Sequence, residues 1–151
     1  MDGTTLAYTG AALAAIFGAL ASSIGMYFAG AKAAGVLGEK PELFGKLLVI
    51  AALPGSQGIY GLLIALMTFK SIGDLGAEIT TTSGAILLLA GCVMAFSALA
   101  SAFFQGKVCA GCIGAIARDG SVSGKSIILS ALIETYAVFG LIVSILMITN
   151  A

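Results

Sequence analysis

The chain has 151 residues, of which 60% are hydrophobic and only 9% are charged, and its mean hydropathy is +1.12. A water-soluble domain carries roughly 25% charged residues, so this composition excludes a surface covered by water alone. The formal net charge is zero and there is no His, so the chain has neither a basic stripe for nucleic acid nor a His-based metal motif. We therefore expect an integral membrane protein that does not bind nucleic acid.

Four apolar stretches predict an all-α membrane fold with four transmembrane helices. They cover roughly residues 6–37, 43–69, 81–116 and 126–149, and each exceeds the ~20 residues that span a bilayer core. The polar breaks between them are short, so neighbouring helices should be antiparallel and form two helical hairpins. No positive charge occurs in residues 1–5, which argues against a cleaved signal peptide, so the first helix should stay in the membrane.

The positions of the basic residues predict the orientation in the membrane. Only Lys70 lies on the same side as Asp2, Asp74 and Glu78. Loops rich in Lys and Arg stay in the cytoplasm. We therefore expect loops 38–42 and 117–123 in the cytoplasm, and both termini and the middle loop on the outer side. The six basic residues that flank the first and third breaks are Lys32, Lys40, Lys46, Lys107, Arg118 and Lys125.

The two halves of the chain repeat one another. Glycines at positions 30, 35 and 38 recur 76 residues later, and beyond the loop the offset becomes 79, as in Gly61-Leu62 and Gly140-Leu141. Each half has an even number of helices, so both hairpins cross the membrane in the same direction, unlike an inverted transporter repeat. We expect two tandem duplicated hairpins, at residues 1–75 and 76–151.

Two helices carry rows of small residues at four-residue spacing, which let helix backbones approach closely in lipid. A chain rich in Gly and Ala can produce one such row by composition alone, but two rows in matching helices predict tight helix packing. The first row contains Gly10, Ala14, Gly18 and Ser22, followed by Gly25 and Ala29, and the second contains Ala98, Ala102, Gly106, Ala110 and Gly114.

Glu134 is the residue whose position points most directly to a function. It lies nine residues from Lys125, about 13–14 Å along a helix, and so near the middle of a core ~30 Å thick. An ionised carboxylate there costs at least ~2.5 kcal/mol, and such a group usually faces a partner or a water-filled path. A protonated Glu that only joins two helices is the structural alternative, but Asn or Gln could do that without titrating. We therefore expect Glu134 to bind and hand on a cation.

The second helix carries three oxygen-bearing side chains near the same depth. Ser56 and Tyr60 are four residues apart and Gln57 and Tyr60 are three apart, so all three can share one helix face. Pro54 has no N–H and can leave backbone carbonyl oxygens free. A Pro-Gly pair is often a mere kink, but a kink beside three such side chains favours a site.

Gln105 adds an oxygen from the third helix. It lies thirteen residues before Arg118, about 20 Å into the membrane. Alone, it would most simply form a hydrogen bond between helices. With Ser56, Gln57 and Glu134 it predicts an oxygen-only cage with one negative charge, and hard cations favour oxygen ligands.

These residues resemble the membrane rotor-ring subunit, the 16-kilodalton proteolipid or K subunit, of V-type rotary ATPases. The resemblance covers nearly the whole chain, and its most specific segments are residues 53–60, 104–107 and 133–137. It implies a homo-oligomeric ring that rotates in the membrane and carries ions, while other subunits hydrolyse ATP. The chain itself has no ATP site, because a P-loop at residues 120–126 would need Gly at Asp119.

The sequence is similar in particular to bacterial sodium-pumping members of this family. That similarity implies Na⁺ held by Glu134, with Tyr60 steadying its carboxylate. Ser56 stands where the sodium-pump pattern has Thr. Serine keeps the ligand oxygen but has more rotamer freedom than the β-branched Thr. A proton-translocating rotor subunit remains the alternative, because the choice of ion rests mainly on the resemblance. The other implied ligands are the side chains of Ser56, Gln57 and Gln105 and the backbone carbonyl of Leu53.

The resemblance also implies the partners of the chain. We expect a stator membrane subunit that supplies an arginine, central-stalk subunits, and the lipid of a bacterial cell membrane. The offset of 79 places Gly55 opposite Glu134, so the first hairpin has no equivalent carboxylate. Each protomer should therefore carry one ion per four helices.

Three rival functions remain. Cys109 and Cys112 have the spacing of a redox pair and Cys92 is a third cysteine, which suits a four-helix membrane thiol oxidoreductase. Such an enzyme needs two reactive pairs, however, and a free cysteine is most often a small apolar residue. A membrane enzyme acting on thiol conjugates or lipids would depend on Arg118, the only arginine, to capture an anionic substrate. A stand-alone cation channel is the third rival.

Overall fold

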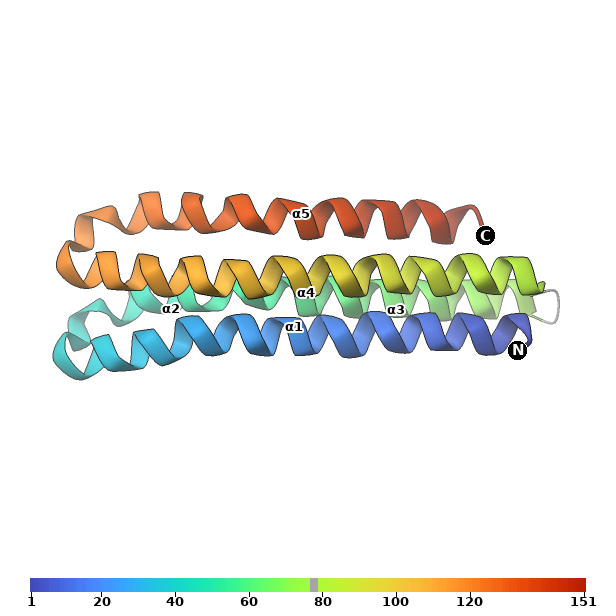
Figure 1. The fold of residues 1–151 in the computed structure, drawn as a ribbon, viewed down its shortest axis with the longest axis horizontal. Helices are drawn as coiled ribbons and strands as arrows, with labels where there is room; N and C mark the ends of the chain where they lie inside the picture. The colour runs from blue at the N-terminus through green and yellow to red at the C-terminus, as the bar shows by residue number, and fades with distance from the viewer. Residues whose placement is uncertain (77–78) are drawn as a thin grey trace.

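The computed structural model describes residues 1–76 and 79–151 (Figure 1). Glu78, which the charge pattern assigns to the outer loop, lies outside the described residues. The described part consists of long helices joined by short turns. These elements are α1 (Gly3–Glu39), η1 (Pro41–Leu43), α2 (Phe44–Ala52), η2 (Leu53–Gly55), α3 (Ser56–Leu75), α4 (Thr81–Arg118), η4 (Gly120–Val122) and α5 (Ser123–Thr149), where η denotes a 3₁₀ turn.

Within the described residues, four helical segments are long and apolar enough to cross a membrane: Gly3–Glu39, Pro41–Leu75, Thr81–Arg118 and Gly120–Thr149. They contain the four predicted stretches and extend beyond them, because the helices continue into the polar residues at their ends. The prediction of an all-α membrane fold with four spans is confirmed. Figure 1 shows the spans running side by side, with both short connecting turns at one end and both chain termini at the other.

Helices α1 and α4 form the tightest contact of the bundle and lie side by side along most of their length (Figure 1). A Cβ atom added at Gly91 would overlap the carbonyl oxygen of Gly10, and one added at Gly106 would overlap that of Gly25. Side chains larger than hydrogen are excluded at these crossing points, because backbone meets backbone. This geometry confirms the tight packing that the rows of small residues predict.

The two rows follow this contact to different extents. All the small residues of the α1 row are buried. In α4 the row is buried only up to Gly106, and Ala110 and Gly114 are half-buried. A step of four residues turns about 40° more than a full helical turn, so a long row drifts away from the contact. Cys109 and Ile113 replace it and are fully buried.

Helices α3 and α5 cover the α1–α4 pair and expose large apolar side chains. Helix α3 packs against α1 and α4, and α5 packs mainly against α4. Leu62 and Leu66 on α3, and Ile128 and Leu132 on α5, are each more than half exposed. Exposed large apolar side chains of this kind are compatible with lipid and not with water.

Two lysines of the first hairpin form hydrogen bonds to the turn of the second hairpin. These bonds lie at the end of the bundle that the charge pattern assigns to the cytoplasm. Lys40 Nζ donates to the carbonyl oxygen of Ala117 over 2.6 Å, and Lys46 Nζ donates to that of Gly120 over 3.1 Å. Ala117 lies in the last turn of α4, where the free carbonyl groups carry a partial negative charge that a lysine stabilises. Both turns are therefore held at the same level of the bundle.

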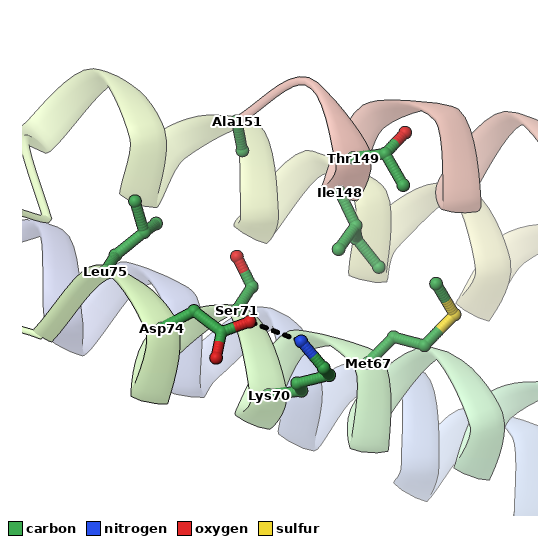
Figure 2. Close-up of a pocket in the computed structure, with 8 residues that line it drawn as sticks. All are labelled: Met67, Lys70, Ser71, Asp74, Leu75, Ile148, Thr149 and Ala151. Atoms are coloured by element: carbon green, nitrogen blue, oxygen red, sulfur yellow. Dashed lines mark hydrogen bonds and ion pairs between the residues drawn. The ribbon is translucent and has the colours of Figure 1, made fainter.

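At the opposite end, α5 stops short of the other helices (Figure 1). A hollow of about 430 Å³ lies between the ends of α3 and α5, and Figure 2 shows the residues that line it. Lys70 and Asp74 form an ion pair within α3 beside it. The single basic residue predicted for this side is thus paired with an acidic neighbour. The hollow is lined by Met67, Lys70, Ser71, Asp74, Leu75, Ile148, Thr149 and Ala151.

Candidate functional site

The second span is interrupted at half depth. Pro54 has no N–H to continue the helical hydrogen bonds. Helix α2 accordingly ends at Ala52, and the 3₁₀ turn η2 leads into α3 at Ser56. The backbone N–H of Ser56 bonds to the carbonyl of Leu53. The break that Pro54 predicts is therefore present, and it places the Leu53 carbonyl beside the polar side chains at the start of α3.

Ser22 of α1 supports this interruption from the neighbouring helix. Its Oγ accepts a hydrogen bond from the N–H of Gly58 over 2.7 Å and donates to the carbonyl oxygen of Gly55 over 3.1 Å. An unpaired buried backbone group costs about 1–3 kcal/mol, so these bonds stabilise the broken segment. In the sequence, Ser22 is recognisable only as a member of a packing row, and this second role is not predicted.

Glu134 of α5 is half-buried and has hydrogen-bond partners on two other helices. The hydroxyl of Tyr60, on α3, donates to its Oε1 over 2.6 Å. Gln105 Nε2, on α4, donates to its Oε2 over 3.4 Å. The carboxyl group therefore lies where three helices meet, with one oxygen directed at each partner.

Two glutamine side chains lie behind this carboxyl group, and both are fully buried. Gln57 Nε2 donates to Gln105 Oε1 over 2.7 Å. Gln105 Nε2 donates to the backbone carbonyl of Ser130 over 3.2 Å. The two amides thus connect α3, α4 and α5 at the level of Glu134.

The remaining predicted oxygens join the same cluster. Ser56 Oγ lies within hydrogen-bond distance of the Leu53 carbonyl oxygen, at 3.2 Å, and of Gln57 Oε1, at 3.3 Å. The structure therefore brings together all six residues predicted from the sequence. They form one continuous hydrogen-bonded set, which runs from Leu53 through Ser56, Gln57, Gln105 and Glu134 to Tyr60.

Ser101 belongs to this cluster and is absent from the prediction. It is 2% exposed, its Oγ accepts from Gln57 Nε2 over 3.0 Å, and it donates to the backbone carbonyl of Ile133 over 3.1 Å. Its position one helical step of four residues before Gln105 is the signal that could have found it, because residues four apart share a helix face.

The cluster opens on one side of the bundle. A hollow of about 590 Å³ is lined by Leu53, Ser56 and Glu134 and otherwise by apolar or small residues of α1, α2, η2 and α3. The two glutamines do not line this hollow and are fully buried within the bundle. A small ion in this cluster would have polar oxygens behind it and an apolar rim in front of it.

The three cysteines are free thiols. Cys109 and Cys112 are buried in an apolar cluster with Ala29 and Leu47, and Cys92 is half-buried. Reactive cysteines sit in electropositive, partly exposed surroundings, whereas cysteines buried among apolar groups are inert. The geometry disfavours the thiol oxidoreductase and supports the interpretation of these cysteines as packing residues.

The sequence matches the family model of the ATP synthase C subunit twice, over residues 9–68 and 88–147. The chain is 37% identical over 149 residues, 99% of its length and 94% of the relative's, to the V-type sodium ATPase subunit K of Enterococcus hirae. It is 40% identical over 127 residues, or 83% of its length, to the A-type ATP synthase subunit K of Methanocaldococcus jannaschii and spans 55% of that longer protein. The human 16 kDa proteolipid of the V-type proton ATPase is 27% identical over 144 residues, which cover 95% of this chain and 91% of the relative.

The two family matches fall in successive helical hairpins, α1 to α3 and α4 to α5, which confirms that the chain is a tandem duplication. Both matches together cover well over half of the chain, and the relative from Enterococcus hirae aligns over almost its full length. Four membrane spans, a duplicated hairpin and these relatives agree with one another. This multi-pass membrane protein belongs to the ATP synthase C subunit family and is a rotor subunit of the c/K type found in V-type ATPases.

Proposed function

We propose that each protomer binds one Na⁺ at Glu134 and carries it across the membrane as a ring of such protomers rotates. The observation that carries the proposal is the continuous set of oxygen atoms around Glu134, contributed by two amides, a hydroxyl, a backbone carbonyl and one carboxylate. Oxygen ligands suit a hard cation. The relative from Enterococcus hirae is named as a sodium ATPase subunit, which supports the choice of ion.

Charge neutralisation explains how such a site can move through lipid. An ionised carboxylate in the membrane is costly, whereas a carboxylate with one bound monovalent cation forms a neutral pair. A loaded protomer can therefore face the hydrocarbon while it travels around the ring. The hydrogen bond from Tyr60 to Oε1 of Glu134 holds the carboxyl group in place, and Oε2 is the oxygen that Tyr60 does not hold.

Unloading requires a partner that opens the site. We assign this role to a stator membrane subunit, whose arginine would attract the Glu134 carboxylate while aqueous half-channels admit and release the ion. The hollow lined by Leu53, Ser56 and Glu134 is the side from which this partner would reach the carboxylate. Central-stalk subunits would couple the ring to ATP hydrolysis elsewhere in the complex.

The proposed orientation places loops 38–42 and 117–123 in the cytoplasm and both termini outside. The excess of Lys and Arg near these loops supports it, as does their shared position at one end of the bundle (Figure 1). We further propose that the two hairpins, residues 1–75 and 76–151, are the units of the duplication, with the ion-binding carboxylate only in the second. Gly55 occupies the corresponding position of the first.

The proposal is tested by carbodiimide modification of Glu134 in membranes that contain the assembled ATPase, at fixed pH, with and without sodium. A bound Na⁺ shields the carboxylate, so millimolar NaCl should slow the modification while KCl of equal ionic strength should not. Labelling that is indifferent to sodium but slows as the carboxylate ionises at higher pH would support the proton as the carried ion, and would contradict sodium binding.

Glu134→Gln provides the matched variant. The amide keeps the size of the side chain and can still accept the hydrogen bond from Tyr60, so the ring should assemble. It cannot carry the negative charge, so ion translocation should stop. Continued pumping by rings of this variant would contradict the role of Glu134.

A further inference from the structure

Ser101 lies between the amide of Gln57 and the backbone of α5. It is buried in α4 and joins the two through one hydroxyl group, which accepts from Gln57 Nε2 and donates to the Ile133 carbonyl. Ile133 directly precedes Glu134 in the chain. The hydroxyl therefore connects the helix turn that carries the carboxylate with an amide that the proposed function counts among the ligands.

The direction of these hydrogen bonds is set by the backbone. A carbonyl oxygen can only accept, and a serine hydroxyl has one proton to donate. Because Ser101 donates that proton to the Ile133 carbonyl, its oxygen is left as an acceptor for Gln57. Gln57 must then present its NH₂ group to Ser101, which turns its carbonyl oxygen, Oε1, toward Ser56.

Gln105 is oriented by the same principle. The carbonyl of Ser130 can only accept, so Gln105 presents its NH₂ group there and offers Oε1 as an acceptor to the NH₂ group of Gln57. Two acceptors, Ser101 Oγ and Gln105 Oε1, thus hold Nε2 of Gln57. Rotating this amide by half a turn would place oxygen against oxygen at both contacts.

We propose that Ser101 is a positioning residue for ion binding, which turns the carbonyl oxygen of Gln57, and not its NH₂ group, toward the ion. The proposal rests on the proposed function, since it assigns a role in the same site. A cation is attracted by the amide oxygen and repelled by the partial positive charge of the NH₂ group. Ser101 therefore contributes to Na⁺ affinity without touching the ion.

Protons and sodium should respond differently to the loss of this hydroxyl. A proton requires only the carboxylate of Glu134, which Ser101 does not contact, whereas Na⁺ also requires the Gln57 oxygen. Ser101→Ala should weaken Na⁺ binding about tenfold, as is typical when a group that orients a metal ligand is removed. The pH dependence of Glu134 modification without sodium should not change. A merely structural defect would alter both.

The experiment measures carbodiimide modification of Glu134 in the assembled ATPase as a function of NaCl at fixed pH, and as a function of pH without sodium. Ser101→Thr keeps the hydroxyl and should restore the sodium response. Ser144→Ala is the control, because Ser144 is also fully buried and donates to the Ala90 carbonyl between α5 and α4 over 2.9 Å, away from the cluster. Its sodium response should match that of the unaltered chain.

The outcomes separate the two proposals. If NaCl fails to protect the unaltered chain, the proposed sodium function is wrong and the role of Ser101 falls with it. If NaCl protects the unaltered chain and Ser101→Ala equally well, or if Ser101→Ala shifts the pH dependence as strongly as the sodium response, only the role of Ser101 is overturned. Should the Ser101→Ala ring not assemble, Ser101→Cys is measured in the same way. Its thiol fills similar space but hydrogen-bonds weakly, and an unchanged sodium response would again overturn the role.

Discussion

Tyr60 of α3 donates its hydroxyl to Oε1 of Glu134 in α5 over 2.6 Å, across 74 residues of sequence. The bond joins the first hairpin to Glu134, the only carboxylate that lies near the middle of a span among the residues that the structure describes. The bond also holds Oε1 of that carboxylate, whereas Oε2 faces the amide group of Gln105. The position of the carboxyl group thus depends on both hairpins, although only the second carries it.

Tyr60→Phe removes this hydroxyl and keeps the ring. A hydrogen bond to a charged group contributes about 1.5–3 kcal/mol, so an untethered Glu134 should bind Na⁺ about tenfold more weakly. The measurement is the NaCl concentration that halves the rate of Glu134 modification. Tyr136→Phe is the control, because Tyr136 is 67% exposed on the same helix as Glu134. If both variants need the same NaCl concentration as the unaltered chain, Tyr60 does not steady the carboxylate.

Ser56→Thr should strengthen Na⁺ binding, and Ser56→Ala should weaken it. The Ser56 hydroxyl lies at 3.2 Å from the Leu53 carbonyl oxygen, and a β-branched side chain is stiffer at χ1, so Thr loses less rotamer freedom when the ion is held. The same sodium titration measures both variants. A Thr variant with weaker binding than Ser would show that the additional methyl group does not fit beside the hollow, and would contradict the prediction.

Gly91→Ala should destabilise the packing of α1 against α4. The new methyl group would overlap the carbonyl oxygen of Gly10, and overpacking of this kind typically costs about 1–3 kcal/mol. Thermal unfolding in detergent should therefore occur at a lower temperature. Gly111→Ala on the same helix is the control, because a Cβ atom there meets no atom within 4 Å, and Ala favours a helix by about 1 kcal/mol over Gly. Equal unfolding temperatures for the two variants would contradict the backbone contact.

Single cysteines should report the orientation in the membrane. With the three native cysteines replaced by Ala, Ser121→Cys in the turn before α5 should react with a membrane-impermeant maleimide only from the cytoplasmic side, and Asn150→Cys only from outside. Sodium transport by the cysteine-free background should persist, since Cys109 and Cys112 are packing residues. The reverse labelling pattern would show that the chain has the opposite orientation. Loss of transport in the cysteine-free background would contradict the interpretation of the cysteines as packing residues and would favour the thiol oxidoreductase.

The sequence by itself determined the spans and the duplication, and it predicted the depth of Glu134. Hydrophobicity over about 20 residues is a local property that decides membrane insertion, and helical rise converts a residue count directly into depth. The six cluster residues could also be named from the sequence, because their motifs resemble those of a known family and stand at matching depth.

Only the tertiary structure decided which side chains complete the cluster. Ser22 and Ser101 are small residues of α1 and α4 that look like packing residues in the sequence, and their hydrogen bonds to Gly55 and to Gln57 appear only once the helices are placed against one another. The half-burial of Ala110 has the same origin. The rotation of a helix about its axis selects the partners of each polar group, and that rotation results from packing against its neighbours, which no single helix encodes.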